Sequence, residues 1–202
     1  MDELGAVYSQ DARRGGAIVG AIAREQLSSC RRRTEITLAL RAQEVAAIPE
    51  GLAIETIRDE AGLKAWVDVW LGGAPAEIRP GMFEVLRQRG LGDDLPWRFF
   101  LGRLDGEPAA TSELFIGEGV AGVQHVVTLP EQRRRGIGRA MTLHVLRDAQ
   151  AMGYRVAVLT ASPDGIGIYR RLGFREYCWF RRYEQARRQI GGNRFESPPS
   201  PR

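Results

Sequence analysis

The sequence has few of the residues that bind metals or form disulfides. It contains two cysteines, Cys30 and Cys178, and two histidines, His125 and His144, in 202 residues. There is no CxxC pair, and neither histidine is close to a cysteine in sequence, so the usual zinc spacings are absent. The same scarcity disfavours a disulfide framework. We therefore predict no metal site and no disulfide.

Long apolar runs are missing as well. No stretch reaches the roughly 18 apolar residues that a membrane span needs. Two acids follow Met1, and the apolar stretch 15–23 is short and is followed directly by Arg24, so a signal peptide is not expected. These absences predict a cytoplasmic protein with no membrane partner.

The composition that remains is that of a folded domain, with 44% apolar and 27% charged residues. The formal net charge of +4 permits an anionic ligand without requiring one. The length predicts one domain with an extension. We divide the chain into an N-terminal extension over 1–50, partly helical near 18–27 and 38–47, a domain over 51–185, and a disordered tail over 186–202.

After residue 50 the apolar pattern switches repeatedly between the period of a strand and that of a helix, which predicts an α/β domain. The turn Asp105-Gly106 is a strong hairpin signal within 97–119. The other strands are expected at 52–59, 120–129, 154–162 and 175–185, and the helices at 60–73, 75–90 (disturbed at Pro80), 137–152 and 163–174.

The segment PEQRRRGIGR (130–139) places dense positive charge on a glycine turn that leads into a predicted helix. The first backbone N–H groups of a helix have no partner inside it, and the helix dipole adds positive potential at the same end. Glycine lets the backbone approach a ligand closely, and the arginines add full charges. The segment therefore predicts a phosphate or pyrophosphate site.

Two common nucleotide-binding patterns do not fit this segment. A P-loop requires GxxxxGK[ST], which does not occur in the chain. A Rossmann fingerprint requires GxGxxG, but GIGRAM has Met141 at the third small position. The next strand, which ends in LTAS, supplies no acid for a ribose.

The pattern that fits is Arg/Gln-x-x-Gly-x-Gly/Ala over 133–138, followed by IYRRLGF at 168–174. Over residues 52–183 the chain resembles the GCN5-related N-acetyltransferase (GNAT) family. The resemblance implies a mixed, mostly antiparallel central sheet flanked by helices. It also implies that the strand ending at Thr128 splays from the strand beginning near Val156, and that acetyl-CoA lies between them.

The resemblance implies a cofactor site along the first of these strands and the turn that follows. The pantetheine amides are expected to pair with the strand backbone, much as an added strand would, and the pyrophosphate to lie on the turn. Ser162 stands where the family often has Asn and is expected to hydrogen-bond the cofactor arm. The implied cofactor-binding residues are Val126, Val127, Thr128, Arg133, Arg134, Arg135, Gly136, Ile137, Gly138, Arg139 and Ser162.

Tyr169 matches the tyrosine that family members often use as a general acid, which would protonate the departing CoA thiolate. The alternative is a half-buried tyrosine that packs a short helix. The general base is left open among His125, Glu113 and Glu118. Strict alternation would put His125 on the face of Val123 and Val127, so a buried structural role is an equal alternative for it. His144 is interpreted as structural, and Cys178 as no nucleophile.

Two functions are consistent with these residues. The first is an N-acetyltransferase that moves an acetyl group from acetyl-CoA to a primary amine by direct transfer in a ternary complex. The second is a catalytically silent acyl-CoA-binding sensor or scaffold. The acceptor is expected to contact 60–96 and the last strands. Asp93, Asp94 and Glu113 could attract a cationic amine, and the alternative, which we favour, is that they are solvated surface acids. The resemblance is compatible with a homodimer. The basic triplet 31–33 is interpreted as solvated surface, so nucleic-acid binding is not expected.

Overall fold

The structure, a computed structural model, describes residues 27–39 and 48–185. The chain divides into two compact units, one formed by Thr34–Trp179 and the other by Met1–Arg33 with Phe180–Arg202. Of the second unit, the described residues are the strand segments 27–33 and 180–185.

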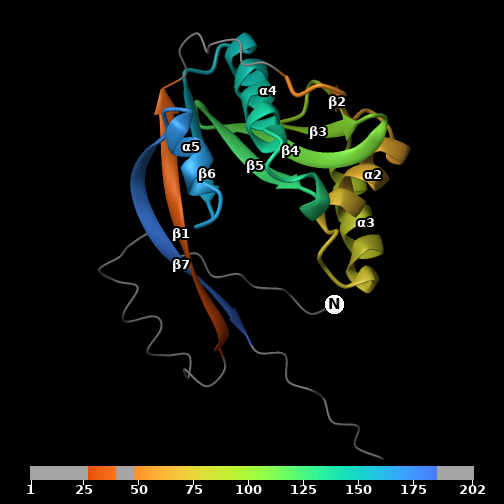
Figure 1. The fold of residues 1–202 in the computed structure, drawn as a ribbon, viewed down its shortest axis with the longest axis horizontal. Helices are drawn as coiled ribbons and strands as arrows, with labels where there is room; N and C mark the ends of the chain where they lie inside the picture. The colour runs from red at the N-terminus through yellow and green to blue at the C-terminus, as the bar shows by residue number, and fades with distance from the viewer. Residues whose placement is uncertain (1–26, 40–47, 186–202) are drawn as a thin grey trace, which may run out of the picture. The chain divides into compact units, whose positions relative to one another are not determined.

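Seven strands form one mixed sheet in the order β2-β3-β4-β5-β6-β1-β7 (Figure 1). Neighbouring strands from β2 to β5 pair antiparallel, as do β1 and β6, whereas β5 and β6 are parallel. The predicted α/β fold with a mixed, mostly antiparallel sheet is confirmed. The strands are β1 (Leu27–Ala39), β2 (Leu52–Thr56), β3 (Trp97–Leu104), β4 (Glu107–Gly117), β5 (Val120–Thr128), β6 (Val156–Ala161) and β7 (Arg175–Gln185).

The helices lie close to their predicted positions. They are α2 (Glu60–Trp70), α3 (Arg79–Arg89), α4 (Ile137–Ala151) and α5 (Ile166–Arg171), with short 3-10 turns at Ala76–Ile78 and Pro130–Gln132. In the described part of the chain, no helix is long and apolar enough to cross a membrane.

Local chemistry explains where two of these helices begin. The carboxylate of Asp59 accepts a hydrogen bond of 2.7 Å from the N–H of Gly62, which satisfies one of the unpaired donors at the start of α2. Pro80 lies in the first turn of α3, where its fixed φ fits and its missing N–H costs nothing. The disturbance predicted at Pro80 is therefore the start of the helix.

Both hairpins on either side of β4 turn through left-handed residues. Asp105 and Gly106 have φ of 52° and 89°, which joins β3 to β4 as a two-residue turn of this kind requires. Glu118 and Gly119, with φ of 49° and 76°, join β4 to β5 in the same way. The predicted Asp105-Gly106 hairpin is confirmed.

The sheet has a buried core on each face. Because successive residues of a strand point to opposite faces, Phe99 packs in one core and Phe100 in the other. The Phe99 core is closed by α2 and α3, through residues such as Trp66 and Leu86. The Phe100 core is closed by α4, which crosses in front of the strands in Figure 1. The predicted stripe of α4 is buried at Met141, Val145 and Ala149.

Strand β1 was not predicted. The helical stretches expected near 18–27 and 38–47 are wrong at Leu27, Leu38 and Ala39, which belong to this strand, and their other residues lie outside the described part. Residues 34–39 pair with β6, from Thr34 opposite Ala161 to Ala39 opposite Val156. Pairing across the sheet decides the conformation of a segment whose own sequence is ambiguous. The division at 50 and 186 stays a prediction.

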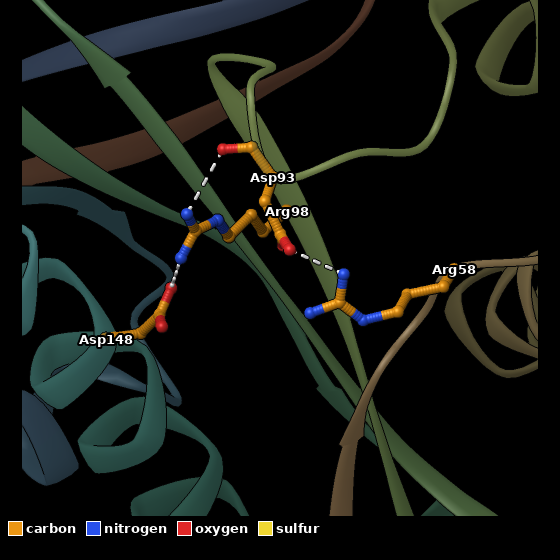
Figure 2. Close-up of polar contacts among 4 residues, drawn as sticks. All are labelled: Arg58, Asp93, Arg98 and Asp148. Carbon is orange, nitrogen blue, oxygen red and sulfur yellow. Dashed lines mark hydrogen bonds and ion pairs between the residues drawn. The ribbon is translucent and has the colours of Figure 1, made fainter.

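Arg98 ties helix α4 to the sheet (Figure 2). One guanidinium nitrogen of Arg98 lies 2.8 Å from the carboxylate of Asp148 on α4, and another donates to the carbonyl of Asp93 at 3.3 Å. The carboxylate of Asp93 accepts from Arg58 at 2.6 Å, and this hydrogen bond lowers the pKa of Asp93. The Arg98–Asp148 pair is partly buried, whereas Arg58 and Asp93 are exposed.

Burial makes the two ion pairs unequal in their effect on stability. We expect Asp148→Asn to lower the free energy of unfolding by about 1–2 kcal/mol, because it leaves the partly buried Arg98 without its counter-charge. Asp93→Asn should change it little, because water screens an exposed pair. Urea unfolding of both variants measures the difference, and equal losses would contradict this assignment.

Candidate active site

The parallel pairing of β5 and β6 is short. It joins Ala121 to Ala157 and Gly122 to Val158. Beyond Gly122, β5 continues to Thr128, while β6 continues to Ala161 and pairs with β1 on its other side. The two central strands therefore part after Gly122, as the family resemblance implied, and the backbone edge of β5 that faces β6 is left without a strand partner there.

A bulge in β5 lies within this unpaired stretch. Thr111 of β4 pairs with Val127 and Glu113 pairs with Gln124, so two residues of β5, His125 and Val126, lie opposite one residue of β4. His125 has φ of 49°, a left-handed conformation that is uncommon for residues other than glycine.

Side chains satisfy the carbonyl groups that the bulge removes from the strand ladder. The hydroxyl of Thr111, which is fully buried, donates to the carbonyl of His125 at 2.9 Å. Across the bulge, the indole N–H of Trp66 on α2 donates to the carbonyl of Ser112 at 3.2 Å. Because a buried carbonyl without a partner is costly, these two hydrogen bonds hold the bulge in place.

The bulge brings His125 against Glu113. Nδ1 of His125 lies 2.5 Å from a carboxylate oxygen of Glu113, whose side chain is 3% exposed, while that of His125 is 31% exposed. The imidazole ring also contacts Trp70 and Trp66, with ring centroids 4.5 and 5.8 Å away. A buried carboxylate that holds a half-exposed imidazole can position that ring for proton transfer.

The bulge also corrects an expectation about faces. Strict alternation placed His125 on the same face as Val123, but Val123 is buried in the core closed by α4, whereas His125 contacts α2. Of the candidate bases, the structure brings His125 and Glu113 together. Glu118 lies exposed in the β4–β5 turn.

The glycine-arginine turn joins β5 to α4. Gly136 has φ of 80° and caps the helix, and the first hydrogen bond inside α4 runs from the N–H of Ala140 to its carbonyl at 3.0 Å. The N–H groups of 137–139 therefore have no partner within the helix. Arg133 donates to the carbonyl of Thr128 at 3.1 Å. Arg134, Arg135 and Arg139 are exposed around the turn.

Gly138 lies between the end of β5 and α5. A Cβ atom there would be 3.6 Å from Oγ1 of Thr128 and 4.0 Å from Ile168. The carbonyl of Gly138 accepts a hydrogen bond of 2.8 Å from Thr142. The turn thus brings the predicted phosphate-binding residues next to the free edge of β5.

Tyr169 and Ser162 both lie beside Gly165, at the start of α5. The hydroxyl of Ser162 accepts from the N–H of Gly165 at 3.2 Å, and a Cβ at Gly165 would be 3.4 Å from the Tyr169 ring. Tyr169 is half-buried and packs edge-on against Phe174. Burial raises the pKa of Tyr169, and a hydrogen bond with Thr142 opposes the shift. The phenol is therefore protonated at neutral pH, as a proton donor must be.

The family profile named Acetyltransferase (GNAT) family matches residues 63–174, which is more than half of the chain. The chain belongs to this family. A search among curated proteins finds no match.

Solved structures of GNAT proteins share the fold. A GCN5-related N-acetyltransferase from Kribbella flavida has a TM-score of 0.60 at 21% identity, covering 83% of this chain and 63% of that one. One from Sphaerobacter thermophilus scores 0.62 at 19% identity and covers 84% of this chain and 56% of that one. A predicted acetyltransferase with acetyl-CoA from Clostridium acetobutylicum has a TM-score of 0.52 at 14% identity. The match covers 62% of this chain and 91% of that one. The chain spans less than two thirds of the length of the first two.

Other candidate residues of this GNAT protein have different surroundings. His144 packs against Phe100, and burial lowers its pKa. Cys178 lies exposed on β7. Asp93, a candidate for attracting a cationic acceptor, is already paired with Arg58. Among residues 27–39 and 48–185, no three His, Cys, Asp or Glu side chains gather in a way that could hold a metal.

Sequence reasoning missed the groups that hold the bulge. Thr111 donates to His125 on β5, and Trp66 donates to Ser112 on β4, beside a register shift that no residue pattern signals. The pairing of Glu113 with His125 depends on the same shift.

The hydroxyl of Thr111 should be needed for the bulge. We expect Thr111→Val to lower the free energy of unfolding by about 1–3 kcal/mol, because it leaves the partly buried carbonyl of His125 without its donor. Thr111→Ser keeps the hydroxyl and should recover most of this loss. Urea unfolding of both variants is the measurement, and a valine variant as stable as the serine variant would contradict the assignment.

The two glycines of the turn should respond differently to alanine. Gly136→Ala puts a side chain at φ of 80° and should destabilise the fold by about 1–2 kcal/mol. Gly138 is not left-handed and a Cβ there meets ordinary contacts, so Gly138→Ala should leave the stability nearly unchanged. Thermal unfolding compares the two, and equal melting temperatures would argue against the left-handed cap.

Proposed function

We propose that this GNAT protein binds acetyl-CoA between β5 and β6 and transfers its acetyl group to a primary amine by direct transfer in a ternary complex. The observation that carries the proposal is that β5 loses its β6 partner after Gly122, directly before a turn rich in glycine and arginine. Family membership and the acetyl-CoA in the name of the Clostridium acetobutylicum neighbour support it.

The free edge of β5 fits the pantetheine arm. Backbone groups of Val126, Val127 and Thr128 can pair with its amides as they would with an added strand. At the end of this edge, the unpaired N–H groups of 137–139 and the arginines 133–135 and 139 can bind the pyrophosphate. Gly138 supports close approach, since it carries no side chain beside Thr128. Ser162, next to Tyr169, is proposed to contact the cofactor arm.

His125 is proposed as the general base and Glu113 as the residue that positions it. In this proposal, Nδ1 of His125 donates to a carboxylate oxygen of Glu113, which leaves Nε2 to accept a proton. Acetyl-CoA supplies the acetyl group as an activated thioester. His125 takes the proton of the attacking amine.

Tyr169 is proposed as the general acid. Burial raises the pKa of its phenol, which therefore retains a proton that it can give to the departing thiolate. No acyl-enzyme is needed, because the enzyme can hold the amine against the thioester in one complex.

Calorimetric titration of acetyl-CoA tests the binding half of the proposal. We expect micromolar binding to the native protein and at least roughly ten-fold weaker binding to Gly138→Glu, because the added carboxylate repels the pyrophosphate. Gly138→Ala is the matched control, with the same backbone position and no charge, and should bind with a smaller loss. No binding to the native protein would contradict the proposal.

Release of CoA in the presence of amines tests the catalytic half. His125→Gln should lower kcat roughly 100-fold or more with acetyl-CoA binding unchanged, because it removes the proton acceptor. Tyr169→Phe should also lower kcat without weakening binding. A native protein that binds acetyl-CoA but acetylates no amine would instead be a silent binding module.

A further inference from the structure

A pocket opens on the face of the sheet that α2 and α3 partly cover. It is lined by Arg89, Trp97, Glu113, Phe115 and Gln124. The strand register explains why these groups converge. Trp97 lies directly opposite Phe115, and Glu113 directly opposite Gln124, in neighbouring antiparallel pairs. Phe115 and Glu113 are two residues apart on β4, so all four side chains share one face.

Glu113 belongs to this pocket and to the proposed proton-transfer pair at once. Its carboxylate contacts Nδ1 of His125, and its residue is 2% exposed, which makes it the floor of the pocket. Phe115, at 41% exposed, and Gln124 stand at the open side. A molecule in the pocket would therefore lie beside the proposed general base.

Arg89 gives the pocket a positive charge that is held in place. Its guanidinium lies over the ring of Trp97, 5.6 Å from the centroid. The indole N–H of Trp97 in turn donates to the carbonyl of Gly90 at 3.2 Å. Stacking on a fixed ring limits the motion of the guanidinium, so less rotamer entropy is lost when it binds a ligand.

No carboxylate neutralises Arg89 among residues 48–179, whose side chains the structure describes. Arg87, two residues earlier on α3, differs in this respect. It pairs with Glu84 at 2.8 Å and with Glu60 at 3.6 Å. Arg87 is therefore a suitable control for Arg89, because its guanidinium is already paired with carboxylates, whereas that of Arg89 can bind a ligand.

We propose that this pocket binds the acceptor, and that the acceptor is a small amine carrying a carboxylate and an apolar or aromatic group, as an α-amino acid does. This inference rests on the proposed acetyltransferase function. Arg89 binds the carboxylate through paired N–H donors, which match its planar geometry. Phe115 and Trp97 contact the apolar group, and the amine is directed toward Glu113 and His125.

The reaction at this site balances without a further reactant. The amine nitrogen forms a bond to the acetyl carbonyl carbon, and the carbon–sulfur bond breaks. The amine proton passes to Nε2 of His125, and the thiolate takes a proton from Tyr169. The products are an N-acetylated amino carboxylate and CoA.

The test compares acceptors and variants together. CoA release is measured with L-phenylalanine, L-phenylalaninamide and phenethylamine, which share a side chain and differ in the carboxylate. We expect Arg89→Gln to lower kcat/KM for phenylalanine roughly ten- to hundred-fold, mainly through KM. For phenylalaninamide and phenethylamine, kcat/KM should change little. For each amine, kcat/KM of the variant is divided by kcat/KM of the native protein, so the intrinsic reactivity of that amine cancels.

Two further variants make the result specific. Arg87→Gln removes one positive charge from the same helix and should leave all three rates near native. Arg89→Lys keeps the charge but loses the paired donors. Its kcat/KM for phenylalanine should lie between those of the native protein and Arg89→Gln. Arg89 is exposed, so thermal unfolding should show that its variants remain folded.

Other outcomes would overturn the inference. An equal effect of Arg89→Gln on phenylalanine and phenethylamine would show that Arg89 does not bind a carboxylate. Acetylation of other amines but none of these three, with acetyl-CoA still bound, would overturn this acceptor class and leave the acetyltransferase function standing. Absence of acetyl-CoA binding would overturn the proposed function, and this inference with it.

Discussion

The bulge in β5 is the feature on which the rest of the candidate site depends. Two residues of β5 lie opposite one residue of β4, and the hydroxyl of Thr111 and the indole of Trp66 satisfy the carbonyls that this arrangement removes from the ladder. The bulge turns His125 toward α2 and against Glu113. It lies in the stretch where β5 has parted from β6. A bulge redirects side chains locally, so this irregularity accounts for the position of the imidazole and lies on the free strand edge.

The two faces of the sheet contribute different parts of the candidate site around this bulge. On one face, α4 closes a core through Met141 and Val145, and its N-terminus presents unpaired N–H groups at the end of β5. On the other face, α2 holds His125 through its tryptophans, and the pocket beside Glu113 stays open. In the account proposed here, the cofactor would approach along the edge of β5 and the amine from the open face, so the two would meet near His125.

Sequence patterns predicted most elements, because the alternating strands, the Asp105-Gly106 turn and the apolar stripe of α4 are local signals. They also predicted that the glycine-arginine turn leads into a helix, because the glycines, the arginines and the start of the helix are adjacent in sequence. They missed β1 because its conformation is fixed by pairing with a strand more than a hundred residues away in the chain. Sequence patterns did not predict the contact between Glu113 and His125, because a register shift breaks the alternation of side chains on which such predictions rest.

The edge of β5 beyond Gly122 is proposed to receive acetyl-CoA. Amide hydrogen exchange with and without saturating acetyl-CoA tests it most directly, because backbone N–H groups that gain a hydrogen-bond partner exchange more slowly. We expect slower exchange at 126–128 and 136–139, with little change in α3. Unchanged exchange at 126–128 in a protein that binds acetyl-CoA would contradict it and place the cofactor elsewhere.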